Sequence, residues 1–256
     1  MGKDGFGPGV EERLQPLGPA LNLAAKPADP RLHGRLRGHQ LRPRQQWLLD
    51  HYLPRLRFPP DAAADAGGAF AVRPERLAIE IGFGGGEHAI ATAGADPALG
   101  LIACEVFEPG LCSLLSALAP EGLPEPEPPA NLRVWDEDAR VLLRGLPDAC
   151  LSAAWLMFPD PWPKLRHTKR RFVHPEQVRL MARVMKVQAI WRVASDDPTY
   201  QQWVEDVMAV QDLFDAPPPA SARPPGWPPT RYEAKALKAG RTPRYWTFTR
   251  TAQSLL

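Results

Sequence analysis

The sequence predicts a doubly wound α/β fold, in which a mostly parallel sheet carries helices on both faces. Short apolar segments alternate with segments of helical character along most of the chain, and this alternation is typical of parallel strands joined by right-handed crossovers. The strands are predicted near Leu77, Leu101, Leu132, Ala153 and Ile190. The helices are predicted near Ile90, Leu114, Val141, Leu180 and Val204. Residues 245–249 are aromatic and β-branched, which predicts a late strand that we expect to run antiparallel.

Composition and charge narrow the class of protein. At 256 residues the chain is long enough for one α/β domain with a substantial core. Its formal net charge is only +2, so affinity for nucleic acid must come from local clusters of cations. Its three cysteines are odd in number and lack metal-like spacing, which predicts reduced thiols in a cytoplasmic protein and no bound metal. No segment approaches the roughly 20 apolar residues of a membrane helix, and the N-terminus resembles neither a signal nor a transit peptide.

Two units are predicted along the chain. Residues 1–45 are rich in glycine, proline and arginine and are predicted to form a flexible basic extension, with residues 46–256 forming the folded domain. Within this extension, residues 31–44 carry five arginines and no acid. A helix is predicted over residues 42–56, and residues 61–68 are predicted to be a linker because they are small.

A glycine-rich loop follows the first predicted strand. Residues 82–86 read Gly-Phe-Gly-Gly-Gly, and without Cβ atoms such a loop lets a ligand approach the backbone closely. About twenty residues later the second strand ends in Glu105, at the position where a carboxylate binds ribose hydroxyls. A dinucleotide fingerprint needs a third glycine where Glu87 stands, and an acid there opposes a pyrophosphate. The loop therefore favours a nucleoside without phosphates, such as S-adenosylmethionine, over NAD.

A second candidate site follows the fourth predicted strand. Residues 158–164 read Phe-Pro-Asp-Pro-Trp-Pro-Lys, so the carboxylate of Asp160 stands between two prolines that restrict its backbone. The next residues, 165–171, are strongly basic. Ligands of open α/β sheets bind beyond the carboxyl ends of the strands, so a rigid acid beside cations predicts chemistry on a polyanion. The alternatives are a solvated basic loop and, for Trp162, either stacking on a base or packing in the core.

Over residues 32–250 the chain resembles the bacterial tRNA (guanine-N7-)-methyltransferases. Five segments carry the resemblance, in this order: Glu80–Gly84, Phe158–Trp162, Arg166–Arg171, Ala194–Asp196 and Thr230–Glu233. The resemblance implies a Rossmann-like class I S-adenosylmethionine-dependent methyltransferase fold. It also implies tRNA as the partner and a methyl transfer to guanosine N7 at position 46 of the variable loop.

The resemblance also implies the roles of individual residues. Those expected at the cofactor are Glu80, Gly82, Gly84, Glu105, Asp138 and Asp160. Those expected to bind the substrate are Lys164, Asp196, Thr230, Arg231, Tyr232 and Glu233. Those expected to contact RNA are Arg166, His167, Thr168, Lys169, Arg170 and Arg171.

Asp160 is the predicted catalytic residue on chemical grounds. Guanine N7 has a free lone pair at neutral pH, so the enzyme must mainly place it in line with the methyl group in a site drained of water. A fixed carboxylate can stabilise the positive charge that shifts during transfer. Other acids have structural alternatives. Asp138 can cap the helix that begins at Ala139, either Asp196 or Asp197 can cap the next helix, and Thr230 with Glu233 matches a capping box.

The chain departs from the family pattern at two places. Met185–Ala189 replaces a Pro-Gly-Gly turn before the fifth strand, and these residues tolerate positive φ poorly. Phe107 replaces a histidine that many relatives carry after the ribose-binding acid.

Two other functions fit the sequence. Asp160-Pro161-Trp162 resembles the D-P-P-aromatic loop of exocyclic-amine methyltransferases, and a non-catalytic RNA-binding module with this fold is the other alternative. NAD-dependent oxidoreduction ranks last because the glycine pattern fails. The assembly is predicted to be a monomer or a homodimer.

Overall fold

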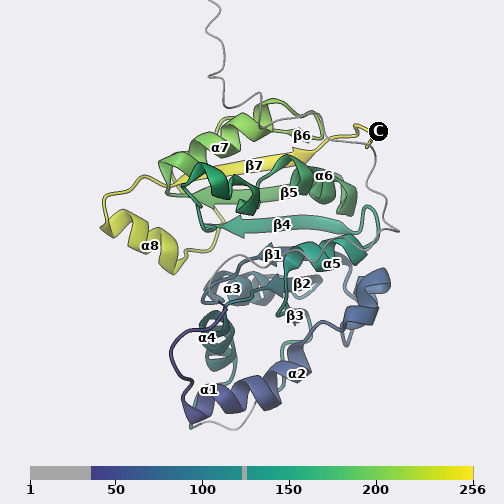
Figure 1. Ribbon diagram of the computed structural model, residues 1–256. Helices are drawn as coiled ribbons and strands as arrows, with labels where there is room; N and C mark the ends of the chain where they lie inside the picture. Colours follow the sequence, from purple (N-terminus) through teal and green to yellow (C-terminus); the bar gives the residue numbers. More distant parts are fainter. Residues whose placement is uncertain (1–35, 123–125, 256) are drawn as a thin grey trace, which may run out of the picture.

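The computed structural model describes residues 36–122 and 126–255. Over these residues the chain forms one seven-stranded sheet with the strand order β3-β2-β1-β4-β5-β7-β6 (Figure 1). The strands are β1 (Arg76–Ile81), β2 (Leu99–Cys104), β3 (Leu132–Trp135), β4 (Leu151–Met157), β5 (Met185–Ser195), β6 (Phe214–Asp215) and β7 (Arg244–Arg250). Strands β1 to β5 are parallel, whereas β7 runs antiparallel to β5 and β6 antiparallel to β7. The predicted doubly wound sheet and its late antiparallel strand are confirmed; β6 was not predicted.

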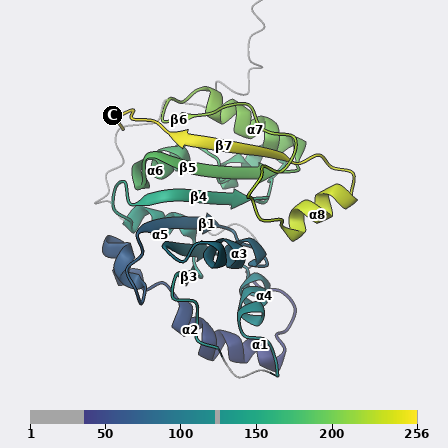
Figure 2. The same ribbon diagram turned by 180° about the vertical axis from the view of Figure 1, so that it is seen from behind.

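Helices cover both faces of this sheet (Figures 1 and 2). The α-helices are α1 (Pro43–Trp47), α2 (Leu53–Leu56), α3 (Glu87–Ala95), α4 (Glu108–Leu118), α5 (Ala139–Gly145), α6 (Pro175–Val184), α7 (Pro198–Ala209) and α8 (Arg231–Lys238). A π-helical turn, Leu48–Tyr52, joins α1 to α2, which confirms the helix predicted over residues 42–56. Helices α5, α6 and α7 share one hydrophobic core, and α1 to α4 share a second core on the opposite face.

The two cores explain why the central strands are largely apolar. Every residue of β2 is buried, with Ile102 in one core and Leu101 in the other. Strands of a parallel sheet that is covered on both faces read as continuous apolar runs, whereas the polar groups gather where the strands end. The carboxyl ends of β1, β2, β3 and β4 therefore meet at one edge, which is where the predicted site residues lie.

The segment 61–68 was predicted to be a linker, and this prediction is wrong. Pro60–Ala69 forms 3₁₀-helical turns with one non-helical residue, Asp65. Ala66 is buried in the core beside α5. Small side chains allow this segment to approach the core closely, so here the small residues reflect packing against the core.

Residues 36–44 lie along α4. The Glu108 amide donates to the Leu36 carbonyl at 2.9 Å at one end of α4, and the Arg44 guanidinium donates to the Ala119 carbonyl at 2.9 Å at the other. Residues 1–35 of the predicted extension lie outside the described residues, so the boundary at residue 45 stays a prediction.

Strand β5 contains a bulge at the departure from the family pattern. Leu151 of β4 pairs with Met185 and Ala153 with Ile190, so residues 186–189 stand opposite Ser152 alone. Gln188 adopts φ +69° there. The chain therefore keeps the positive φ that the Pro-Gly-Gly turn of the family pattern would have, but Gln188 adopts it in place of a glycine.

Candidate active site

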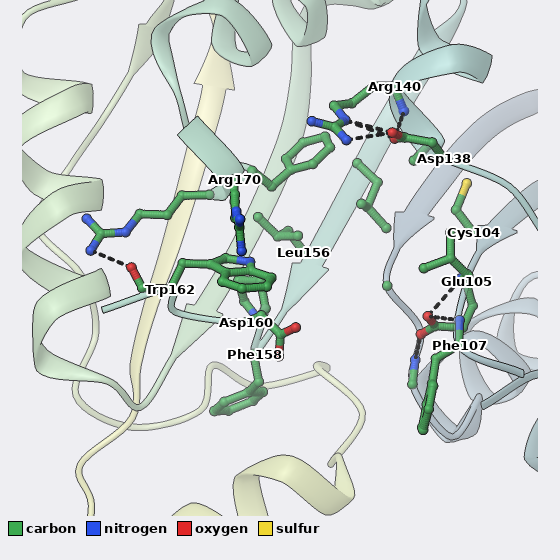
Figure 3. A pocket seen from close by; sticks show the side chains of 18 of the residues that line it. Cys104, Glu105, Phe107, Asp138, Arg140, Leu156, Phe158, Asp160, Trp162 and Arg170 are labelled. Atoms are coloured by element: carbon green, nitrogen blue, oxygen red, sulfur yellow. Dashed lines mark hydrogen bonds and ion pairs between the residues drawn. The ribbon is translucent and has the colours of Figure 1, made fainter. Parts of the chain in front are cut away.

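A cavity of about 400 Å³ lies at the carboxyl edge of the sheet (Figure 3). It draws its lining from the ends of β1 to β4, from the basic segment after β4 and from α8. The predicted site residues that line it are Gly82, Gly84, Glu105, Asp138, Asp160, Arg170, Arg171 and Tyr232. Residues that are far apart in the sequence therefore form one site, and its volume lies in the range typical of small-molecule pockets.

The glycine loop forms one wall. Gly84 has φ +59°, and a Cβ atom there would lie 2.5 Å from the ring of Tyr232 on α8. The loop therefore touches α8 closely, and glycine is required at this position by both its backbone and its neighbour. Burial and the nearby carboxylate of Glu105 raise the pKa of Tyr232, so its phenol stays neutral and can donate a hydrogen bond into the cavity.

Glu105 is fixed by the backbone around it. Its Oε2 accepts from the Gly84 amide at 2.8 Å, and its Oε1 accepts from the amides of Val106 and Phe107 at 2.8 and 2.9 Å. Burial raises the pKa of Glu105, and these three amides oppose that effect in part. A carboxylate offers about four acceptor positions, so one remains for a ligand hydroxyl.

Asp138 caps α5, as the structural alternative predicted. It accepts from the Arg140 amide at 2.9 Å and from the Arg140 guanidinium at 2.6–3.0 Å. Asp138 also lines the cavity, but its carboxylate accepts four hydrogen bonds from Arg140, so a ligand donor would have to displace part of the Arg140 guanidinium. Sequence reasoning missed Arg140, although a cation two residues after an N-cap acid is a visible signal.

Glu80 does not line the cavity. Side chains alternate along a strand, and this one shares a face with Ala78 under α3 rather than facing the ligand edge. Its side chain is 1% exposed, and its Oε2 lies 2.9 Å from His88 Nδ1, with His88 2% exposed. The His88 ring meets Trp155 edge-on, with centroids 5.8 Å apart. Glu80 thus supports the strand and helix that flank the glycine loop, and its role at the cofactor, implied by the resemblance, stays a prediction.

The loop that carries Asp160 is strained and clamped. Phe158 has φ +53° and Trp162 has φ +43°, on either side of an exposed Asp160. Arg171 donates from Nε to the Pro161 carbonyl at 3.0 Å and from Nη2 to the Trp162 carbonyl at 3.1 Å. Arg171 is only 4% exposed, so the structure corrects its predicted RNA contact: its guanidinium holds the loop.

The remaining basic residues form a short 3₁₀ helix, Leu165–Arg170. Lys164, Arg166 and Lys169 are exposed. Arg170 lines the cavity, and its guanidinium carbon lies 4.8 Å from the Trp162 ring centroid. His167 meets the same ring edge-on at 5.6 Å, and the Thr168 carbonyl accepts from the Arg171 amide at 3.0 Å. The surface cations thus lie beside the cavity mouth.

The predicted substrate residues of α8 divide into two groups. Tyr232 lines the cavity, whereas its neighbours stabilise the helix and its position. Thr230 caps α8 by accepting from the Glu233 amide at 3.1 Å, and the Glu233 carboxylate accepts from Tyr245 and Arg223. Arg231 pairs with Glu87 and donates to the Ser113 hydroxyl at 2.9 Å.

Asp196 and Asp197 have different partners. Asp197 caps α7 by accepting from the Tyr200 amide at 2.9 Å. Asp196 instead pairs with Arg241, which follows α8. This pair ties the end of β5 to the segment that carries Tyr232, and the Asp196 carboxylate lies outside the cavity lining.

Comparison with known proteins assigns the family. A family model described as "Putative methyltransferase" matches residues 74–244. The tRNA (guanine-N(7)-)-methyltransferase of Granulibacter bethesdensis is 59% identical over 91% of this chain and 99% of its own length. Those of Rhodospirillum rubrum and Paramagnetospirillum magneticum are 42% and 40% identical, over 87% and 91% of this chain and 88% and 98% of their own lengths. The sheet order and the matched family together identify a Rossmann-like class I methyltransferase fold. The chain belongs to the tRNA (guanine-N(7)-)-methyltransferase family.

Proposed function

We propose that this protein transfers the methyl group of S-adenosylmethionine to N7 of guanosine in tRNA, at position 46 of the variable loop. The observation that carries the proposal is the convergence of Glu105, Asp138 and Asp160 on one cavity beside exposed cations. The negatively charged cavity suits a nucleoside that carries a cationic sulfonium. The positively charged surface beside it suits an RNA backbone.

The residues present fit the cofactor. Glu105 keeps an acceptor position for a ribose hydroxyl, and Gly82, which lines the cavity and has no atom within 4 Å of its missing Cβ position, lets the ligand approach the backbone. Asp138 follows the third strand and lines the cavity, and it would accept from the adenine amine in exchange for part of its contact with the Arg140 guanidinium. When bound, S-adenosylmethionine supplies a methyl group on a positively charged sulfur.

Asp160 is proposed as the catalytic residue. In the transfer the N7 lone pair forms the new N–CH₃ bond while the S–CH₃ bond breaks and its electron pair stays on sulfur, so the positive charge moves to guanine. The Asp160 carboxylate, held in place by the clamped loop, stabilises that charge along its path. No proton has to leave before the transfer, so the reaction needs no general base to activate N7.

RNA binding is proposed for the exposed cations beside the cavity, Lys164, Arg166 and Lys169. Each can neutralise a phosphate and release a counterion, so the affinity should fall with salt. Within the described part of the chain the structure contains no helix with the length and hydrophobicity needed to cross a membrane.

The test is incubation of the protein with labelled S-adenosylmethionine and unmodified tRNA transcript, followed by nucleoside analysis. We expect the label in 7-methylguanosine, and its loss when guanosine 46 is replaced by adenosine. The variant D160N keeps the side-chain shape and removes the charge, so we expect it to bind S-adenosylmethionine and to lose most of the methyl transfer. Label in an exocyclic-methylated nucleoside, or binding of S-adenosylmethionine without transfer to any tRNA, would refute the proposal.

A further inference from the structure

We infer that Trp162 is the surface on which the target guanine stacks during transfer; this inference rests on the function proposed above. The indole lines the cavity and is only half-buried, so part of the ring is available to a ligand. Figure 3 shows the ring at the cavity wall, between Arg170 and Asp160. A base at this position would lie beside the proposed catalytic carboxylate.

The backbone at Trp162 is strained. A bulky residue with φ +43° is a conformational outlier, and such residues cost roughly 1–3 kcal/mol and persist only where the surroundings fix them. Here the next residue is Pro163, which further disfavours helical backbone at Trp162. An aromatic ring that merely filled the core could do so with ordinary backbone geometry. The strain therefore indicates that the position of this ring is functional.

Arg171 holds the loop in this strained conformation. Arg171 donates directly to the carbonyl of Trp162 and to that of Pro161, and its guanidinium stacks over Trp203 at 4.9 Å. A cation that is almost fully buried thus donates hydrogen bonds to two backbone carbonyls of the loop. Charged donors make stronger hydrogen bonds than neutral ones, so this clamp fixes the loop before any ligand arrives.

The electrostatics of the Trp162 ring favour a base that becomes positively charged. The guanidinium of Arg170 lies over the ring at 4.8 Å, which shows that the indole already attracts a cation to its π system. Guanine becomes positively charged as N7 is alkylated, so its attraction to the indole grows between the bound state and the transition state. Trp162 would therefore contribute to the rate of transfer as well as to binding.

The experiment compares W162F, which keeps an aromatic face, with W162L, which keeps an apolar side chain without one. Single-turnover methyl transfer to the tRNA transcript is measured at saturating cofactor, and S-adenosylmethionine affinity is measured by calorimetry. We expect W162L to lose roughly 5- to 150-fold in rate, the equivalent of about 1–3 kcal/mol of stacking, and W162F to keep most of the rate. Cofactor affinity should stay unchanged in both variants, which also shows that they fold.

Two outcomes would overturn the inference. Either W162L transfers methyl groups at the wild-type rate, or W162F is as slow as W162L while both bind the cofactor normally. If W162L loses cofactor binding, the rate of methyl transfer to tRNA is measured for R171K instead. The shorter cation weakens the hydrogen bonds that hold the loop but leaves the Trp162 ring in place. A wild-type rate for R171K would also overturn the inference. Failure of the wild-type protein to form 7-methylguanosine would instead refute the proposed function.

Discussion

The buried pair of Glu80 and His88 gives the sharpest prediction, because the structure and the family resemblance assign Glu80 different tasks. The perturbation is H88F, which removes the partner of a carboxylate that is 1% exposed. An unpaired charge at such a site costs roughly 3–5 kcal/mol. This is a large part of the roughly 5–15 kcal/mol that stabilises a typical domain. For a chain of this size the unfolding midpoint should fall by about 6–20 °C.

The assay is a double-mutant cycle of H88F, E80M and the two together, with the free energy of unfolding taken from guanidinium titrations. The double variant should recover most of the loss, since an apolar pair of similar volume leaves no buried charge. It should also bind S-adenosylmethionine with wild-type affinity. Loss of a carboxylate that contacted the cofactor would instead weaken binding roughly 10- to 150-fold.

Either of two results would refute the reasoning. If H88F unfolds at the wild-type midpoint, His88 does not hold the buried carboxylate. If the double variant is stable but binds cofactor far more weakly, Glu80 contacts the cofactor after all. In that case the resemblance would be the better guide at this position.

Three further predictions concern the surface, the cofactor site and the bulge. Replacing Lys164, Arg166 and Lys169 with alanine should weaken tRNA binding and flatten the log–log salt dependence by roughly 0.7–0.9 per lost phosphate contact, as measured by filter binding; an unchanged slope would show that these cations are solvated. Burial raises the pKa of Glu105, so S-adenosylmethionine affinity should fall on acidification at a higher pH than an ordinary glutamate would give, and calorimetry of E105Q should show weak binding without this pH dependence. Q188G should raise the free energy of unfolding by about 0.5–1 kcal/mol, because glycine relieves a positive φ at the expense of a more flexible unfolded chain; a lower stability would show that the Gln188 side chain contributes contacts of its own.

Much of the fold could be predicted because its signals are local. Strand β2 is apolar throughout and the other parallel strands are largely apolar, and Glu105 and Asp160 follow strand ends, so the sheet edge that brings them together was foreseeable. Strand β6 escaped prediction because two residues carry no periodicity. The small residues of 61–68 were misread because their composition does not distinguish tight packing from a linker.

The site was less predictable where its contacts are long-range. The sequence shows a basic run after Asp160, but it does not show that Arg171 turns inward to hold the loop while Lys169 faces solvent. The pairing of Glu80 with His88 depends on how α3 packs over β1. Such choices are made by tertiary packing, and neither spacing nor residue type records them.

The contact between the glycine loop and its neighbours has a consequence for how such chains can change during evolution. A Cβ atom at Gly110 would lie 2.4 Å from the Gly84 carbonyl, and one at Gly84 would meet the Tyr232 ring. Two positions from the first part of the domain and one from its last part thus share one small volume. We expect them to covary among relatives: a side chain at position 84 requires a smaller residue at 232, and growth at 110 requires a displaced loop.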